Sequence, residues 1–258
     1  MILVKLGGSV ITDKSEYRTF DAPGVAMLCR EIKDSGKDVI VVHGAGSFGH
    51  IIAKEHGLAD GYKDKSQIPA VAEVCRDVRE LNGMVVSELI SAGIPAVGVP
   101  PGSCFMMDDG VLSLGDAEVL RRFVDLGIMP VMFGDVVLDR KQGFGICSGD
   151  QVMERLCDLF PTESVVFVSD VDGLYSTNPK EDPDAVMYGV VTEDLLGNVE
   201  SAMYVADVTG GVAGKMRSML RMCAPGRDCH MINGKVPGRL LSLLRGEEVI
   251  STKAIGGD

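Results

Sequence analysis

The chain has 258 residues with a formal net charge of −12, and 46% of them are hydrophobic while only 5% are aromatic. This composition excludes a disordered chain and predicts an aliphatic core of substantial size. The acidic balance disfavours partners such as nucleic acid or an anionic membrane, although a small phosphate can still be bound locally.

The seven cysteines are odd in number and contain no C-x-x-C pair, so the sequence predicts neither a disulfide framework nor a zinc ribbon. Free thiols of this kind fit a reducing compartment. Met1 leads directly into a strand-like run without a basic leader, and no stretch approaches the roughly 18 consecutive apolar residues of a membrane span. We therefore expect a cytoplasmic protein.

Short apolar runs alternate with longer segments of helical periodicity. The runs occupy residues 2–6, 38–43, 94–99, 128–133 and 164–169. Such alternation predicts parallel strands joined by crossover helices, and uniformly apolar runs suit strands that are buried on both faces of a sheet. The expected fold class is α/β, a three-layer αβα sandwich with a mainly parallel central sheet.

Two of the helices are well bounded in the sequence. Residues 21–35 carry Asp21 as an N-cap and end at Gly36. Residues 68–92 carry apolar side chains at helical spacing and form the longest expected helix, which could line a pocket. No linker, repeat or low-complexity tract divides the chain, so we expect a single domain over residues 1–258.

Glycines gather where the predicted strands end, which is the edge where open α/β sheets bind their ligands. The first cluster, K-L-G-G-S at residues 5–9, allows backbone N–H groups to approach an anion closely, with Lys5 adding a positive charge. An ordinary tight turn with a solvated lysine is the alternative interpretation.

The second cluster, H-G-A-G-S-F-G-H at residues 43–50, matches the dinucleotide fingerprint G-x-G-x-x-G. The context disagrees, because the segment that follows is not strand-like, although Asp60 and Asp64 lie there. A helix N-terminus that holds a phosphate remains the better interpretation. His50, one turn into that helix, can donate to the same phosphate, while His43 and His56 are expected to be structural.

The third cluster follows the strand at 164–169 and contains Asp170 and Asp172. Because the spacing of a calcium loop is missing, a turn that receives a ribose or base is expected. The fourth, T-G-G-V-A-G-K-M at residues 209–216, is not a Walker loop, since Thr209 replaces the first glycine and Met216 follows Lys215. It still offers a second phosphate cradle at a helix start.

If the acceptor of a phosphoryl group is itself a phosphate, separate backbone cradles and several lysines are needed to overcome the repulsion between the two anions. Bringing two polyanions together costs roughly 4 kcal/mol per pair of unit charges about 4 Å apart at an effective dielectric of 20. Lys5, Lys14 and Lys215 are the cations near the loops, with Lys180 as a further candidate. Mg²⁺ would accompany a nucleotide, and phosphoryl transfer of this kind needs positioning and charge neutralisation more than a catalytic base.

In their order along the chain these motifs resemble the amino acid kinase superfamily. The resemblance rests on K-L-G-G-S, the glycine-rich loop after the second strand, S-G-D at 148–150, S-D-V-D-G-L-Y at 169–175, and T-G-G-V-A-G-K-M. Within that family, the loop ending in His50 is similar to that of the isopentenyl phosphate kinases, which make isopentenyl diphosphate from isopentenyl phosphate and ATP in isoprenoid biosynthesis. Fosfomycin kinases are near relatives.

The resemblance implies an ATP site and an acceptor site. Residues of the ATP site would be Lys5, Gly7, Gly8, Ser9, Gly46, Asp170, Tyr175, Lys180, Gly211, Gly214 and Lys215. Residues of the acceptor site would be Gly44, Ala45, Gly46, His50 and Gly149. The residues expected in catalysis are Lys5, Lys14, His50, Asp150 and Lys215, with Asp150 orienting the lysines. No protein ligand to the metal is implied.

The resemblance also implies a division of labour, with acceptor binding in about 1–160, nucleotide binding in about 161–258, and a homodimer as the common assembly. A prenyl tail would need a dry pocket, for which the candidates are Val74, Cys75, Val78 and Ile146. Ordinary core packing explains any one of them as well. Two other functions stay open, namely a kinase for fosfomycin or another small phosphonate, and a nucleotide sensor without catalysis.

Overall fold

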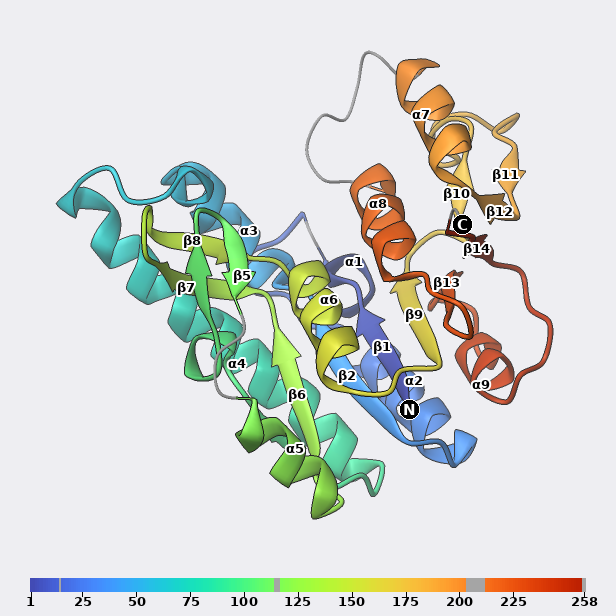
Figure 1. Ribbon diagram of the computed structural model, residues 1–258, viewed down its shortest axis with the longest axis horizontal. Coiled ribbons are helices and arrows are strands. Elements are labelled where there is room, and N and C mark those ends of the chain that lie inside the picture. Colours follow the sequence, from blue (N-terminus) through green and yellow to red (C-terminus); the bar gives the residue numbers. More distant parts are fainter. Residues whose placement is uncertain (14, 114–116, 203–211, 257–258) are drawn as a thin grey trace.

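The computed structural model describes residues 1–13, 15–113, 117–202 and 212–256. Within this part of the chain, a central sheet has eight strands in the order β12-β14-β13-β9-β1-β2-β6-β3 (Figure 1). They are β1 (Ile2–Leu6), β2 (Val39–His43), β3 (Ala96–Gly98), β6 (Met129–Phe133), β9 (Ser164–Ser169), β12 (Val190–Val191), β13 (Asp228–Asn233) and β14 (Thr252–Ala254). Neighbouring strands run parallel except β13 and β14.

Helices cover both faces of this sheet (Figure 1). The described helices are α1 (Gly8–Ile11), α2 (Ala22–Ser35), α3 (Gly46–Glu55), α4 (Ile68–Ser91), α5 (Glu118–Asp125), α6 (Gly149–Leu159), α7 (Glu193–Ala202), α8 (Val212–Met222) and α9 (Arg239–Leu244). Buried side chains of α2, α4 and α9 pack with Val4 and Val41 on one face of the sheet. Those of α6 and α8 pack with Leu3 and Val42 on the other. The three-layer αβα prediction is confirmed.

The two helices expected from the sequence are present with nearly the expected bounds. Asp21 caps α2 by accepting a hydrogen bond from the Gly24 amide at 3.1 Å, and Gly36 ends the helix with φ +66°. The long helix α4 has 24 residues. Its buried face is mostly aliphatic but includes Asp77, whose side chain is fully buried.

No pattern in the sequence predicts the second sheet, whose strands come from segments before and after β6. Its strands are β4 (Met106–Asp108), β5 (Val111–Ser113), β7 (Asp135–Asp139) and β8 (Gly143–Cys147), in the order β5-β4-β7-β8. Side chains of β7 and β8 join α3 and α4 in a separate apolar cluster that includes Val74, Val78 and Phe133. This small sheet therefore builds one wall beside the long helix α4.

A short β-ribbon and short 3₁₀ turns lie between the longer elements. A two-stranded ribbon pairs β10 (Leu174–Tyr175) with β11 (Met187–Tyr188). Residues 58–68, predicted not to be a strand, contain two short 3₁₀ turns, Leu58–Asp60 and Lys65–Gln67. No helix in the described ranges is both long and apolar enough to cross a membrane.

The contact between α4 and the sheet gives a test of the fold. Leu81 on α4 is fully buried, so Leu81→Ala should lower the free energy of unfolding by about 2–5 kcal/mol. Ile90 on the same helix is 56% exposed, and Ile90→Ala should change it by only about 0.5 kcal/mol. Denaturant unfolding of both variants measures the difference, and equal losses would contradict this packing.

Candidate active site

Three neighbouring strands of the sheet end in a glycine at the same edge. Gly7 follows β1, Gly44 follows β2 and Gly134 follows β6. A Cβ on Gly134 would lie 3.5 Å from the Gly149 nitrogen and 3.6 Å from the Ala45 nitrogen. The turns thus bring backbone amides from separate elements together, which is the arrangement that binds an anion.

The first two turns pack backbone against backbone. A Cβ on Gly8 would lie 2.7 Å from the Gly46 Cα, and a Cβ on Gly44 would lie 2.8 Å from the Gly8 nitrogen. Both distances are too short for any side chain, so these positions require glycine. Gly134 is missing from the sequence prediction, although its place directly after the apolar run at 128–133 was a usable signal.

Below these turns a buried lysine meets a carboxylate. Lys5 lies on β1 with 7% of its surface exposed, and its Nζ forms an ion pair with Asp150 in the first turn of α6. The same Nζ lies 5.3 Å from the centre of the Phe167 ring. A buried ammonium ion needs such a partner, because desolvation of an unpaired charge is costly. The pair therefore fixes the position of the Lys5 ammonium group.

The start of α6 is held rigidly where it meets Lys5. Ser148 Oγ accepts a hydrogen bond from the Gln151 amide, and Gln151 Oε1 accepts one from the Ser148 amide, each at 3.2 Å. This is a capping box, which fixes the entry to the helix. A Cβ on Gly149 would lie 3.1 Å from the Lys5 Cε, so the glycine admits the lysine side chain.

A cleft of about 670 Å³ lies beside the first glycine turn. It is lined by Ser9, Thr12, Asp13, Ser15, Thr19, Phe20, Asp21, Asp170, Lys180 and Lys235. Three residues predicted for the nucleotide meet here, since Ser9 Oγ donates to Asp170 at 2.8 Å and Lys180 pairs with the other oxygen of Asp170. Burial disfavours the charged form of Asp170, but these hydrogen bonds outweigh it and lower the pKa of its carboxyl to about 2.

Lys235 also lines this cleft and is missing from the sequence prediction. Its Nζ pairs with Asp21 at 2.6 Å and donates to the Val10 carbonyl at 3.0 Å. The sequence shows the pattern N-G-K at 233–235, which again places a glycine and a lysine together. The strand that precedes it, β13, was not predicted, so the pattern could not be recognised as a strand end.

The remaining residues predicted for ATP are spread more widely. The Tyr175 hydroxyl donates to Asp172 at 3.2 Å, and Asp172 pairs with Arg239. Burial, followed by the charge of Asp172, raises the pKa of Tyr175. Gly214 and Lys215 lie near the start of α8. The predictions for Lys14 and Gly211 fall outside the described residues.

The three histidines near the second glycine turn lie in different environments. His43 is fully buried, stacks on Phe133 with ring centres 5.4 Å apart, and has its Nδ1 3.0 Å from the Gly44 carbonyl oxygen. Its Nε2 lies 3.1 Å from the Asn82 amide nitrogen. Both ring nitrogens thus have partners in the core, whereas His50 and His56 on or beside α3 are exposed.

The residues predicted for a prenyl tail do come together. Val74 and Val78 are buried in the apolar cluster between α3 and α4, with Cys75 and Ile146 packed against it. A Cβ on Gly49 would lie 3.1 Å from Val78 Cγ1, so α3 and α4 approach closely one residue before His50. The N-terminal part of α3 therefore has the glycine turns on one side and this apolar cluster on the other.

Burial of His43 predicts a pH dependence of stability. Burial lowers the pKa of His43 to about 4, despite the opposing hydrogen bond to Gly44. In the unfolded chain, His43 takes up a proton below about pH 6.5. The contribution of neutral, buried His43 to the free energy of unfolding is therefore present above about pH 6.5 and is lost as the pH falls toward 4. From pH 7.5 to 5, wild type should lose about 2 kcal/mol more unfolding free energy than His43→Gln.

Denaturant unfolding at the two pH values measures this difference. His56→Gln is the matched control, since His56 is exposed and its replacement should leave the pH dependence of wild type unchanged. If His43→Gln keeps the full pH dependence, the folded protein does not hold His43 neutral.

Sequence and structure comparisons agree with this geometry. The profile of the amino acid kinase family matches residues 1–233. The chain is 37% identical to an isopentenyl phosphate kinase of Methanothermobacter thermautotrophicus, over 99% of both chains, and 37% identical to that of Thermoplasma acidophilum, over 93% of this chain and 94% of the other. A solved isopentenyl phosphate kinase superposes with a TM-score of 0.84 at 33% identity, covering 98% of this chain and 99% of the other. The chain is therefore a member of the amino acid kinase family and, within it, of the group that contains the isopentenyl phosphate kinases.

Proposed function

We propose that this protein is a kinase that transfers the terminal phosphoryl group of ATP to isopentenyl phosphate and thereby makes isopentenyl diphosphate, a step in isoprenoid biosynthesis. The observation that carries the proposal is the buried ion pair of Lys5 and Asp150 beneath the glycine turns. The cleft beside the first glycine turn is lined by Ser9 and Asp170, and a separate apolar cluster lies between α3 and α4. Similarity to enzymes named isopentenyl phosphate kinase, over nearly the full length of both chains, supports the choice of acceptor.

The chemistry requires two phosphate groups to come within bonding distance. An oxygen of the acceptor phosphate forms a bond to the γ-phosphorus of ATP while the bond from that phosphorus to the β–γ bridging oxygen breaks, leaving ADP. A phosphate monoester loses its second proton near pH 6, so the acceptor is already a nucleophile at neutral pH and needs no general base. The protein's task is therefore to position the two groups and to neutralise their charge.

Lys5 is the residue that we assign to this neutralisation. Its ammonium group lies in a site of low solvent exposure, where an electrostatic interaction is stronger than in water. Asp150 holds the Lys5 side chain in place and is not needed as a base. Lys14 and Lys215 remain proposed partners of Lys5 on the transferring group.

The nucleotide and the acceptor would enter from opposite sides of the glycine turns. Ser9, Asp170 and Lys180 line the cleft on one side and are proposed to hold the nucleotide. On the other side, the amides near Ala45 and Gly149 and the imidazole of His50 are proposed to hold the acceptor phosphate. The apolar cluster around Val74 and Val78 is the proposed neighbour of the isopentenyl group.

Mg²⁺ would bind with the nucleotide rather than in a separate protein site. Among the described residues no group of three His, Cys, Asp or Glu side chains could hold a metal ion. Two carboxylates of the proposed site, Asp150 and Asp170, are already paired with Lys5 and Lys180. The site thus fits a metal held by the phosphates and water, where it would neutralise phosphate charge.

The proposals of a homodimer and of a cytoplasmic location rest on the family resemblance and on the cysteines. All seven cysteines are free thiols in the structure, which is compatible with a reducing compartment. Light scattering of the purified protein measures the assembly directly.

The identity of the acceptor is tested by measuring ADP release with a panel of compounds. Isopentenyl phosphate should give a higher kcat/KM than any of the other compounds, which are dimethylallyl phosphate, geranyl phosphate, fosfomycin, N-acetylglutamate and UMP. A preference for fosfomycin would favour a phosphonate kinase. Tight ATP binding without turnover of any acceptor would favour a nucleotide sensor.

His50→Ala tests the proposed contact to the acceptor phosphate. Loss of a hydrogen bond to a charged group corresponds to roughly a 10- to 100-fold change, so kcat/KM for isopentenyl phosphate should fall by that factor. The KM of ATP should change by less than about twofold. His56→Ala, also exposed beside α3, is the matched control and should behave as wild type. Unchanged acceptor kinetics in His50→Ala would remove His50 from the site.

Lys5→Met tests charge neutralisation at the transferring group. Removal of one electrostatic donor from an active site costs roughly 100- to 1,000-fold in kcat, and this loss is expected here. Lys63→Met provides the control, because Lys63 forms an exposed ion pair with Asp60 at 2.7 Å. Thermal unfolding must show that Lys5→Met is folded at the assay temperature. A kcat within about threefold of wild type would contradict the assignment.

A further inference from the structure

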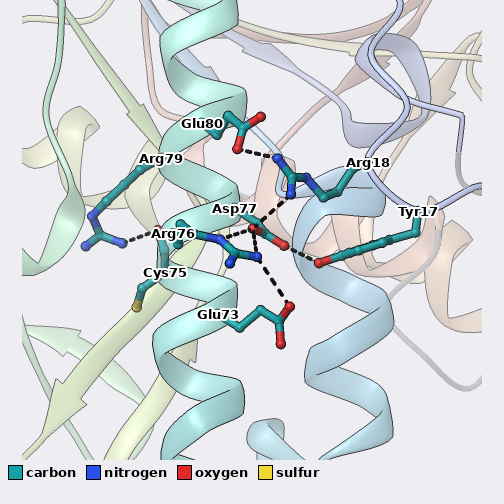
Figure 2. Close-up of polar contacts among 8 residues, drawn as sticks. All are labelled: Tyr17, Arg18, Glu73, Cys75, Arg76, Asp77, Arg79 and Glu80. Atoms are coloured by element: carbon teal, nitrogen blue, oxygen red, sulfur yellow. Dashed lines mark hydrogen bonds and ion pairs between the residues drawn. The ribbon is translucent and has the colours of Figure 1, made fainter.

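The buried carboxylate of Asp77 on α4 binds the non-helical segment between α1 and α2. Asp77 has no exposed side-chain surface, and its carboxylate accepts hydrogen bonds from the Tyr17 hydroxyl and from Arg76 Nε, the latter at 2.8 Å (Figure 2). The Arg18 guanidinium lies 3.8 Å away from it. Tyr17 and Arg18 belong to the segment between α1 and α2, so Asp77 joins two parts of the chain that are 60 residues apart.

Acidic side chains gather on the face of α4 that meets this segment. Glu73, Asp77 and Glu80 lie three or four residues apart, and Figure 2 shows them on the side of α4 that faces Tyr17 and Arg18. Like charges at this spacing repel one another on a helix. Arg76 pairs with Glu73 and Asp77 from within the helix, whereas Arg18 pairs with Glu80 and approaches Asp77 from outside. Arg18 therefore supplies one of the two guanidinium groups that offset these three carboxylates, and it does so only when the segment is docked.

The docked segment is held in an unfavourable backbone conformation. Arg18 has φ +60°, in the left-handed region that residues other than glycine rarely adopt. Besides its contacts to α4, its guanidinium lies 5.7 Å from the centre of the Phe48 ring on α3. Such a conformation persists only where several contacts impose it, and it is typical of functional sites.

Hydrogen bonds connect this segment to both glycine turns. The Thr19 amide donates to Ser47 Oγ at 3.3 Å, and the Ser47 amide donates to Thr12 Oγ at 3.1 Å. The Thr12 hydroxyl donates in turn to the Gly8 carbonyl at 2.7 Å. Movement of the segment would therefore change the position of Gly8 and of the helix start at Gly46.

We propose that Asp77 is a positioning residue for phosphoryl transfer. By binding Tyr17 and Arg18, it holds the glycine turns in a fixed position relative to α4, the helix beside the proposed acceptor site. This inference rests on the proposed function for its kinetic consequence, but not for its structural one. Asp77 acts through Tyr17 and Arg18 and does not touch the reacting groups.

The kinetic test compares Tyr17→Phe, Asp77→Asn and the double variant. The Tyr17 side chain is 44% exposed and Tyr17→Phe removes only the hydroxyl, so this variant should fold even if Asp77→Asn does not. With ATP and isopentenyl phosphate, each single variant should lower kcat about tenfold, since small misplacements are costly in transfer reactions, while the KM of ATP stays within about twofold. The double variant should be no slower than the slower single variant.

Arg76→Ala is the matched control, because Arg76 also binds Asp77 but comes from the same helix. It should lower the thermal unfolding temperature while keeping kcat within about twofold of wild type. A kcat loss in Arg76→Ala equal to that in Tyr17→Phe, or an unchanged kcat in Tyr17→Phe, would overturn the proposal, since the cluster would then serve stability alone.

Hydrogen exchange measured without substrate provides the second readout. Peptides that contain the Thr19 and Ser47 amides should exchange about tenfold faster in Tyr17→Phe than in wild type, and at the wild-type rate in Arg76→Ala. If wild type turns over no acceptor, the proposed function fails while this result still decides the docking role. Equal exchange in Tyr17→Phe and wild type would overturn the docking role.

Discussion

Backbone crowding at one edge of the sheet is the constraint on which the site depends. β1, β2 and β6 are neighbours, and the turns that follow them are so close that no side chain fits at Gly8 or Gly44. This crowding gathers peptide N–H groups that no single loop could supply. It also places Lys5, near the end of β1, directly beneath them with Asp150 as its partner. Any backbone shift at this edge would therefore move the amides and the ammonium group together.

The glycine turns are supported from two sides. The capping box at Ser148 fixes the start of α6 and hence the partner of Lys5. On the far side, the contacts of Tyr17 and Arg18 with Asp77 attach the turns to α4. A site that must align two repelling phosphates gains from such support, because a flexible cradle would let the groups move apart.

Patterns that act locally were sufficient to predict the main elements. The apolar runs at 2–6 and 164–169 coincide with β1 and β9, and Asp21 caps α2 as expected. The first two glycine clusters follow strand ends that meet in the structure, whereas Gly134 was missed and the fourth cluster lies partly outside the described residues. The second sheet was missed because β4 and β5 are only three residues long and β8 is rich in glycine, and because the pairing that joins the two hairpins, β4 with β7, links segments distant in sequence. Asp77 was missed because its partners, Tyr17 and Arg18, are distant in sequence. A single carboxylate in an apolar helical stripe does not by itself indicate such a contact.

The small sheet of β4, β5, β7 and β8 is separate from the central sheet that carries the glycine turns. Its hairpin β7–β8 lies between β6 and α6 in the chain and supplies one wall of the apolar cluster, whereas Lys5 and the glycine turns lie at the ends of the central strands. Substitutions on its inner face can reshape that wall without moving Lys5 or the strand ends. The same scaffold can thus evolve toward new acceptors by changing this small sheet while its phosphoryl chemistry is conserved.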